Sequence, residues 1–343
     1  MNGILIYGKA LIAVENRVPT LKVQNLETTF FLKSGPFRAV KGLSYEIYPG
    51  ETLGIVGESG CGKSVTSLAV MRLIENPGKI TGGQVFFNNE DVLKISESKM
   101  EDLRGSKIAM IFQEPMTALN PVLTIGQQID EQILRHENIS VEQAKTRSIE
   151  MLSLVGIPSP EERYTNYPHQ LSGGMRQRAM IAMALSCHPQ VLIADEPTTA
   201  LDVTIQAQIL ELIQTLQKKF NMAVQFITHD LGVISEISDR VLVMYGGQVC
   251  ESAPTQELFA NPQHPYTSAL MNSRPHLGQR TRRLQTIEGT VPAPHEFPKG
   301  CPFANRCPSA SEICWNEPPP VTQVNPGHLV ACYHPMKQTG AHP

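Results

Sequence analysis

Short apolar runs alternate with longer segments of helical periodicity along most of this chain. Apolar and polar residues alternate over residues 20–30 and again over residues 43–47, which predicts two strands that bury one face. Five almost wholly apolar runs predict buried strands at residues 52–56, 108–112, 191–194, 223–227 and 240–244. Because helical patterns separate most of these strands, we predict an α/β fold with a doubly wound, mainly parallel sheet.

The pattern changes twice along the chain. From residue 114 to residue 185 it is helical, with Ile125, Ile129 and Ile133 at four-residue spacing, which predicts a helical insertion between core strands. After about residue 255 frequent prolines predict an irregular extension that contains one short helix. The expected organisation is an N-terminal extension at 1–19, a core at 20–113 and 186–255, a helical subdomain at 114–185 and a C-terminal extension at 256–343.

Composition narrows the class of protein. The 343 residues are 41% hydrophobic and 18% charged, which is typical of a globular protein with a substantial core. A net charge of −3 argues against a general nucleic-acid binder. No apolar run approaches the ~20 residues of a membrane-spanning helix. The first 14 residues lack the basic start of a signal peptide and are expected to form a loosely packed extension.

A glycine-rich segment lies between the apolar run at 52–56 and a helical pattern. Its sequence, GESGCGKS, fits the phosphate-binding pattern G-x-x-x-x-G-K-[ST], and a chance glycine turn is the alternative. Glycines let backbone N–H groups turn toward a phosphate, Lys63 adds positive charge, and Ser64 offers a hydroxyl to Mg²⁺. The predicted nucleotide-binding residues are Gly57, Glu58, Ser59, Gly60, Cys61, Gly62, Lys63 and Ser64.

A second candidate site lies where the apolar run at 191–194 ends in two carboxylates, Asp195 and Glu196. Ligands of open α/β sheets bind at the carboxyl ends of the strands, so acidic residues there favour metal chemistry over a merely solvated strand end. Asp195 is expected to hold Mg²⁺, and Glu196 is expected to polarise the attacking water.

These motifs belong to a set whose order and spacing resemble the ABC ATPase family. The set comprises GESGCGKS (57–64), Gln113 in IFQEP, LSGGMRQ (171–177), LIADEP (192–197), Ala200-Leu201-Asp202 and His229 in ITHD. The resemblance implies an ABC cassette of the P-loop NTPase class, in which an antiparallel β subdomain and a helical insertion join the core sheet. It also implies hydrolysis of ATP, with Mg²⁺, between two paired subunits.

The resemblance implies catalytic roles for two further residues beside Glu196. Gln113 would sense Mg²⁺ and the attacking water and would link the core to the helical subdomain. His229 would contact the γ-phosphate and orient the water. Taken alone, His229 would more often be structural; its position in ITHD after a core strand reverses that expectation.

The LSGG segment implies that two subunits share each ATP. Ser172, Gly173 and Gly174 would contact the γ-phosphate of ATP held by the partner, and a serine hydroxyl with glycine N–H groups at a helix start suits an anion. Asp202 would communicate across the dimer. Met175 stands where many members of the family carry glutamine, but the Ser-Gly-Gly core is intact.

An aromatic ring usually stacks on adenine in this family. Phe30, after the first predicted strand, is the expected residue. Phe31 and Phe37 are alternatives, and any of the three could be a packing residue.

Other segments resemble one group within the family, the ATPase subunits of dipeptide and oligopeptide importers, particularly the D type. They are PFRAVKGLSY, MIFQEPMTALNP, YPHQLSGGM and HPYT (264–267), followed by a cysteine-containing extension. The resemblance implies a second, non-identical ATPase, two membrane permeases, an extracytoplasmic binding protein and a place on the cytoplasmic face of the inner membrane. Alternatives are an importer of nickel chelates, haem or other small solutes, a soluble ABC ATPase acting on nucleic acid, or a subunit that does not turn over.

Four of the seven cysteines fall within 32 residues near the end of the chain: Cys301, Cys307, Cys314 and Cys332. Such a cluster more often holds metal than disulfides in a cytosolic chain. The spacing fits a zinc ribbon poorly, whereas a [4Fe–4S] cluster takes four thiolates at looser spacing, and members of this importer group carry such clusters in this region. The expectation is a structural [4Fe–4S] cluster, with zinc and free or disulfide-linked cysteines as the alternatives.

Overall fold

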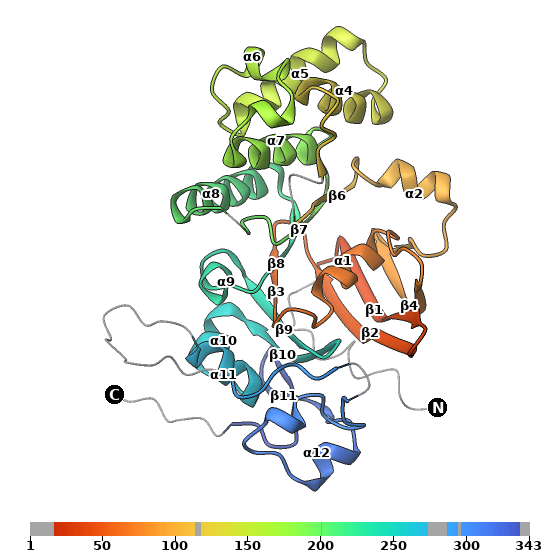
Figure 1. Ribbon diagram of the computed structural model, residues 1–343, viewed down its shortest axis with the longest axis vertical. Helices are drawn as coiled ribbons and strands as arrows, with labels where there is room; N and C mark the ends of the chain where they lie inside the picture. Colours follow the sequence, from red (N-terminus) through yellow and green to blue (C-terminus); the bar gives the residue numbers. More distant parts are fainter. Residues whose placement is uncertain (1–16, 114–117, 200, 274–286, 294–295, 337–343) are drawn as a thin grey trace.

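The computed structural model describes residues 17–113, 118–199, 201–273, 287–293 and 296–336. The expected N-terminal extension therefore lies almost wholly outside the described residues, as does Ala200. Two sheets form the centre of the molecule, a group of helices lies at one end and the C-terminal residues lie at the other (Figure 1).

The larger sheet has eight strands in the order β11-β12-β10-β9-β3-β8-β7-β6. Its parallel part, β9-β3-β8-β7-β6, contains the five strands predicted from apolar runs, each within two residues of its predicted ends. The central strands are buried along their whole length because helices cover one face and the smaller sheet, with α1, covers the other. The bounds of the five are β3 Thr52–Val56, β6 Ile108–Ile111, β7 Val191–Asp195, β8 Ala223–Thr228 and β9 Arg240–Tyr245.

The smaller sheet is antiparallel, in the order β2-β1-β4-β5. Both predicted alternating strands are found in it, but the second is longer than predicted, and β4 was not predicted because three glycines weaken its alternation. The inner faces of the two sheets share one core, in which Leu21 and Val23 pack with Leu53 and Ile55. The bounds are β1 Leu21–Leu32, β2 Gly35–Ile47, β4 Gly78–Phe87 and β5 Glu90–Asp91.

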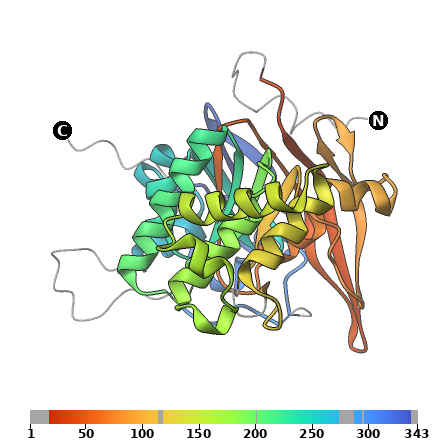
Figure 2. The ribbon, with the colours of Figure 1, turned by 90° about the horizontal axis from the view of Figure 1, so that it is seen from above.

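Helices α4 to α7 follow β6 and form the group seen in front of the sheets in Figure 2. The prediction for Ile125, Ile129 and Ile133 is confirmed, since all three are buried on one face of α4. Among the described residues, every helix is too short or too polar to cross a lipid bilayer. The helix bounds before residue 240 are α1 Lys63–Val70, α2 Glu97–Leu103, α4 Ile125–His136, α5 Val141–Leu154, α6 Pro160–Tyr164, η1 Pro168–Gln170, α7 Gly173–Leu185, α8 Val203–Phe220 and α9 Leu231–Ile237.

The C-terminal extension is less irregular than predicted. The short helix expected after His264 is present as α11, but a hairpin of β11 and β12 was missed, and it pairs with β10 to lengthen the main sheet. The hairpin follows three consecutive prolines, and its two strands are too short to show a clear alternation. The remaining bounds are β10 Gln248–Pro254, α10 Thr255–Ala260, α11 Pro265–Asn272, η2 Ala304–Arg306, α12 Glu312–Asn316, β11 Val321–Asn325 and β12 His328–Ala331.

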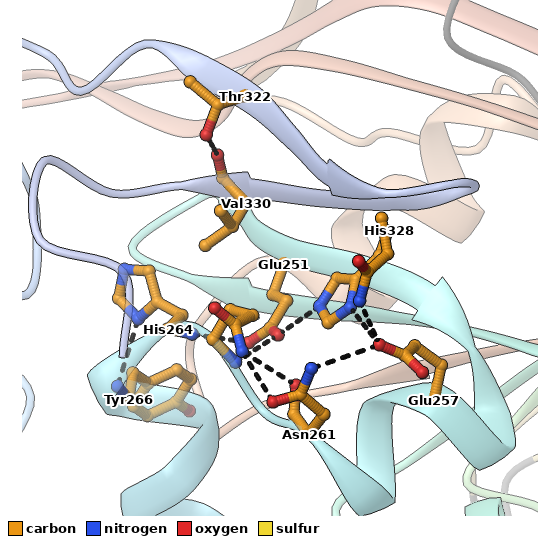
Figure 3. A network of polar contacts seen from close by, with 10 residues as sticks. Glu251, Glu257, Asn261, His264, Tyr266, Thr322, His328 and Val330 are labelled. Atoms are coloured by element: carbon orange, nitrogen blue, oxygen red, sulfur yellow. Dashed lines mark hydrogen bonds and ion pairs between the residues drawn. The ribbon is translucent and has the colours of Figure 1, made fainter. Parts of the chain in front are cut away.

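A buried polar network fastens this hairpin to the core (Figure 3). The fully buried carboxylate of Glu251 accepts hydrogen bonds from the backbone N–H groups of Gln263 and His264, at 2.6 and 2.9 Å. His328 Nε2 lies 2.7 Å from Glu251 Oε1, and its Nδ1 lies 3.3 Å from Glu257 Oε1. Burial alone would lower the pKa of His328, but the two carboxylates outweigh it and raise that pKa above its usual value. The two carboxylates therefore favour the protonated, charged form of His328.

Replacing His328 by Gln should destabilise the protein in a pH-dependent way. A histidine whose pKa is raised by folding stabilises most below its unfolded pKa of about 6.5, and this contribution is lost as the pH rises through the folded value. We expect His328→Gln to lower the free energy of unfolding by about 2 kcal/mol at pH 6 and by less at pH 9, measured by urea unfolding. Asn325→Ala, which removes a hydrogen bond from an uncharged amide to the Glu257 carboxylate, is the control and should show no such dependence between the two pH values. A His328→Gln deficit that stays constant between the two pH values would contradict the prediction.

Candidate nucleotide-binding and catalytic site

The phosphate loop connects the end of β3 to the start of α1. Gly62 adopts a φ of +97°, and a Cβ there would lie 2.5 Å from the carbonyl oxygen of Ala39, so only glycine fits. Lys63 Nζ donates to the carbonyl oxygens of Gly57 and Glu58, at 2.7 and 3.1 Å. The loop thus folds around its own lysine side chain.

The expected metal ligands meet beside this loop. Ser64 Oγ donates to Asp195 Oδ1 at 3.0 Å, which joins the first turn of α1 to the end of β7. Burial raises the pKa of Asp195, and the hydrogen bond from Ser64 and the charge of Lys63 oppose that shift. The described residues contain no group of three histidine, cysteine or acidic side chains placed to hold a metal ion. One carboxylate and one hydroxyl nevertheless fit Mg²⁺, which proteins usually hold through one or two carboxylates together with substrate phosphates.

Glu196 is the centre of a second group. Its Oε2 lies 3.2 Å from Gln113 Nε2, 3.3 Å from His229 Nδ1 and 2.9 Å from the hydroxyl of Thr199. Glu196 also has a φ of +47°, a conformation that is strained for a residue with a side chain and recurs at functional sites. The three predicted catalytic residues are therefore adjacent, and Thr199 is a partner that the sequence motifs did not indicate.

The LSGG segment forms a separate part of the surface. Ser172 caps α7 by accepting from the N–H of Met175, and Asp202 caps α8 by accepting from the N–H of Ile205. Ser172, Gly173 and Gly174 line one depression together with Asp202, and no residue of the phosphate loop lines it. The structure therefore brings these four predicted residues together but keeps them apart from the loop of their own chain. Gln177, in α7, donates a hydrogen bond to the carbonyl oxygen of Pro197 at 2.5 Å. This bond links the helix that begins with the LSGG segment to the residue after Glu196.

The three aromatic candidates for adenine stacking occupy the hairpin of β1 and β2. Phe30 and Phe37 lie opposite each other in the strand register, so their side chains share one face. Phe31 points to the other face and is half exposed. The ring of Phe30 also lies against Gly78, where a Cβ would come within 2.8 Å of it.

All four clustered cysteines line one small cavity in the C-terminal extension. They are free thiols, which excludes the disulfide alternative in this structure. Burial raises the pKa of Cys301 to about 11 and that of Cys332 to about 12, and neighbouring thiols add to both shifts. Such thiols become thiolates only beside a strong positive centre. No three of them, however, are placed around a single metal ion, so the described residues contain no preformed metal site in this extension.

Two residues of the C-terminal extension reach the phosphate loop, and the sequence did not reveal either role. Arg306 pairs with Glu58 through both guanidinium Nη atoms, and the hydroxyl of Tyr266 accepts a hydrogen bond from the N–H of Glu58. Tyr266 stands in the HPYT segment and Arg306 directly before Cys307, but no spacing rule pairs residues more than 200 positions apart.

Two family models match the chain. The model described as "ABC transporter" matches residues 40–199, and the model described as "Oligopeptide/dipeptide transporter, C-terminal region" matches residues 250–314. The first range contains the phosphate loop and the LSGG segment. The second contains Tyr266 and three of the four clustered cysteines.

Curated relatives match almost the whole chain. It is 53% identical to the probable peptide ABC transporter ATP-binding protein y4tR of Sinorhizobium fredii, over 91% of this chain and 94% of the relative. It is 51% identical to the dipeptide transport ATP-binding protein DppD of Bacillus subtilis, over 91% and 94%. It is 48% identical to DppD of Escherichia coli, over 93% and 98%.

Two solved structures match about 70% of this chain. The dimeric bacterial ABC transporter cassette MJ0796 superposes with a TM-score of 0.62 at 28% identity, covering 68% of this chain and 98% of that one. The cassette cbiO1 of Clostridium perfringens superposes with a TM-score of 0.61 at 29% identity, covering 71% and 91%.

Replacing Asp195 by Asn should raise the Mg²⁺ requirement of ATP hydrolysis. The amide keeps the size of the side chain and its contact with Ser64 but removes the negative charge that faces the metal. We expect the Mg²⁺ concentration for half-maximal hydrolysis to rise at least about tenfold. Even the loss of a residue that only hydrogen-bonds to a metal ligand typically weakens metal binding by about 10–100-fold. Asp102→Asn, on exposed α2, is the matched control. An unchanged Mg²⁺ requirement in Asp195→Asn would exclude this carboxylate as a ligand.

Proposed function

Because this chain belongs to the ATP-binding subunits of ABC transporters, in the oligopeptide and dipeptide group, we propose that its ATP hydrolysis drives import of dipeptides or oligopeptides. The match in the C-terminal region carries the choice of substrate class, because the cassette motifs alone are common to the whole family. The cluster of Gln113, His229 and Glu196 supports turnover rather than a merely regulatory role.

Each residue of the site would have a distinct role in ATP hydrolysis. Backbone N–H groups of residues 57–64, together with Lys63, would hold the phosphates. Ser64, Asp195 and Gln113 would hold Mg²⁺, which neutralises charge on the β- and γ-phosphates. Glu196 would accept a proton from the attacking water as general base. His229 would orient that water. Phe30 remains the proposed adenine-stacking residue.

The separation of the LSGG segment from the phosphate loop supports a paired arrangement. We infer that Ser172, Gly173 and Gly174 complete the ATP site of a second subunit, with Asp202 at the same interface. A second ATPase, two membrane permeases and an extracytoplasmic binding protein would form the importer, with this chain on the cytoplasmic face of the inner membrane. Nucleic acid is not a proposed partner. The helical subdomain at 114–185 would contact the permeases, and the core at 20–113 and 186–255 would bind ATP.

For the C-terminal extension at 256–343 we propose a [4Fe–4S] cluster on Cys301, Cys307, Cys314 and Cys332. Their common cavity and their free thiols support the proposal. The thiolates around such a cluster lie farther apart than those around one ion, so a cluster does not require the close placement that zinc does. A cluster would supply the positive centre that buried thiolates need, and its role would be structural.

Replacing Glu196 by Gln should abolish hydrolysis while ATP binding persists. The amide keeps the size of the side chain but cannot accept a proton, and general-base catalysis is typically worth about 10²–10⁴-fold in rate. Hydrolysis in the assembled complex measures the loss, with Glu211→Gln on the exposed face of α8 as control. Unchanged hydrolysis would mean that another group acts as the base.

The same variant tests the transport function in cells. Cells that carry Glu196→Gln should lose uptake of a labelled dipeptide, and the Glu211→Gln control should retain it. Loss of hydrolysis without loss of peptide uptake would show that the importer carries a different solute.

Purification without oxygen should yield a brown protein with absorbance near 400 nm. About four iron and four sulfide per chain are expected. Cys307→Ser should lose the colour and iron, whereas Cys187→Ser, at a buried cysteine remote from the cluster sequence, should retain both. A colourless preparation free of iron would contradict the cluster.

A further inference from the structure

We propose that Arg306 and Tyr266, two residues of the C-terminal extension, are positioning residues that hold the phosphate loop in its nucleotide-binding conformation. The inference rests on the proposed function in one respect, namely that the loop at 57–64 binds ATP. The extension would then take a direct part in nucleotide binding.

The first contact is a bidentate ion pair. Arg306 Nη1 lies 2.6 Å from Glu58 Oε2, and Nη2 lies 3.1 Å from Oε1, a geometry that fixes both side chains. The Arg306 side chain is only 4% exposed. Its Nε also donates to the carbonyl oxygen of Glu288 at 2.9 Å, and Nη1 donates to the Tyr245 hydroxyl at 3.2 Å. These two further hydrogen bonds fix the orientation in which the guanidinium group faces Glu58.

The second contact acts on the backbone of the same loop residue. The N–H of Glu58 donates to the hydroxyl of Tyr266 at 2.8 Å. Tyr266 is fully buried, and its ring packs edge-on against Tyr245 and tilted against Phe303, with ring centres 4.7 and 5.2 Å away. Tyr245 ends a core strand and Phe303 belongs to the extension, so this aromatic cluster joins the two regions directly beneath the loop.

Glu58 is where these contacts meet the phosphate site. Its carbonyl oxygen accepts from Lys63 Nζ at 3.1 Å and from the N–H of Cys61 at 3.3 Å, within the loop itself. Fixing residue 58 therefore fixes the turn that presents Lys63, and a loop that is already ordered loses less entropy when a ligand binds. Arg306 also neutralises a carboxylate that would otherwise repel a triphosphate on the same loop.

The two effects of Arg306 can be separated by mutation in the full-length protein. We expect Arg306→Ala to weaken binding of MgADP, measured by calorimetry, by about tenfold, or about 1.4 kcal/mol. Glu58→Gln added to Arg306→Ala should recover at least about a third of that affinity, because it removes the unneutralised charge. Recovery should stay incomplete, because the double variant still lacks the ion pair that holds the loop. Full recovery would show that the unneutralised charge alone causes the loss and would contradict the positioning role.

Tyr266→Phe removes one hydroxyl from the second contact and leaves the aromatic packing. It should weaken MgADP binding about threefold or more without lowering the melting temperature by more than a few degrees. If Arg306→Ala does not fold, Tyr266→Phe decides the question. Asn325→Ala, which loosens the extension far from the loop, is the matched control and should bind MgADP normally.

Lys63→Ala separates failure of this inference from failure of the proposed function. If Lys63→Ala abolishes binding while Arg306→Ala and Tyr266→Phe bind like the wild type, the loop binds nucleotide and the inference is wrong. If Lys63→Ala binds normally, the proposed nucleotide site itself is wrong. Weak binding by Asn325→Ala as well as by the other two would also overturn the inference, because any loosening of the extension would then suffice.

Discussion

The parallel pairing of β3, β8 and β7 is the constraint on which the site depends. In the observed register Val56 lies opposite Thr228, and Asp195 lies opposite Ile227. The three strands therefore end together, and the loops that leave them carry the phosphate loop, Glu196 and His229. A slip of one residue in any pairing would turn a strand's side chains to the opposite face and separate these groups. These strands are mostly apolar and are buried along their whole length.

The C-terminal extension depends on the same sheet in a different way. It is joined to the sheet edge by β12, by the Glu251–His328 network and by the aromatic cluster around Tyr245. These attachments bring Arg306 and Tyr266 to the phosphate loop. The contacts that attach the extension therefore also stabilise the conformation of the phosphate loop.

The sequence predicted those parts of the molecule whose structure depends mainly on residues that are close together in the chain. Apolar runs gave the five parallel strands, and contiguous motifs gave the loop, the acidic strand end and the LSGG cap. Strand β4 and the β11–β12 hairpin escaped prediction because their glycines and polar residues become regular only through pairing with distant strands. The role of Arg306 was not predicted for the same reason, since its partner Glu58 is distant in the sequence. Thr199 was not predicted although Glu196 is a near neighbour, because none of the recognised motifs includes it. The four cysteines were expected together and do share a cavity, but their spacing could not fix how closely they approach.

The central claim is that ATP held by this chain is hydrolysed only when the LSGG segment of another subunit closes on it. The most direct measurement is the rate of ATP hydrolysis per molecule of this chain as the proposed second ATPase subunit is added in increasing amounts. The account predicts a low rate for the dilute single chain, which rises until the two are present in equal amounts and then stays level. A rate that is high from the start and indifferent to the second subunit would contradict it.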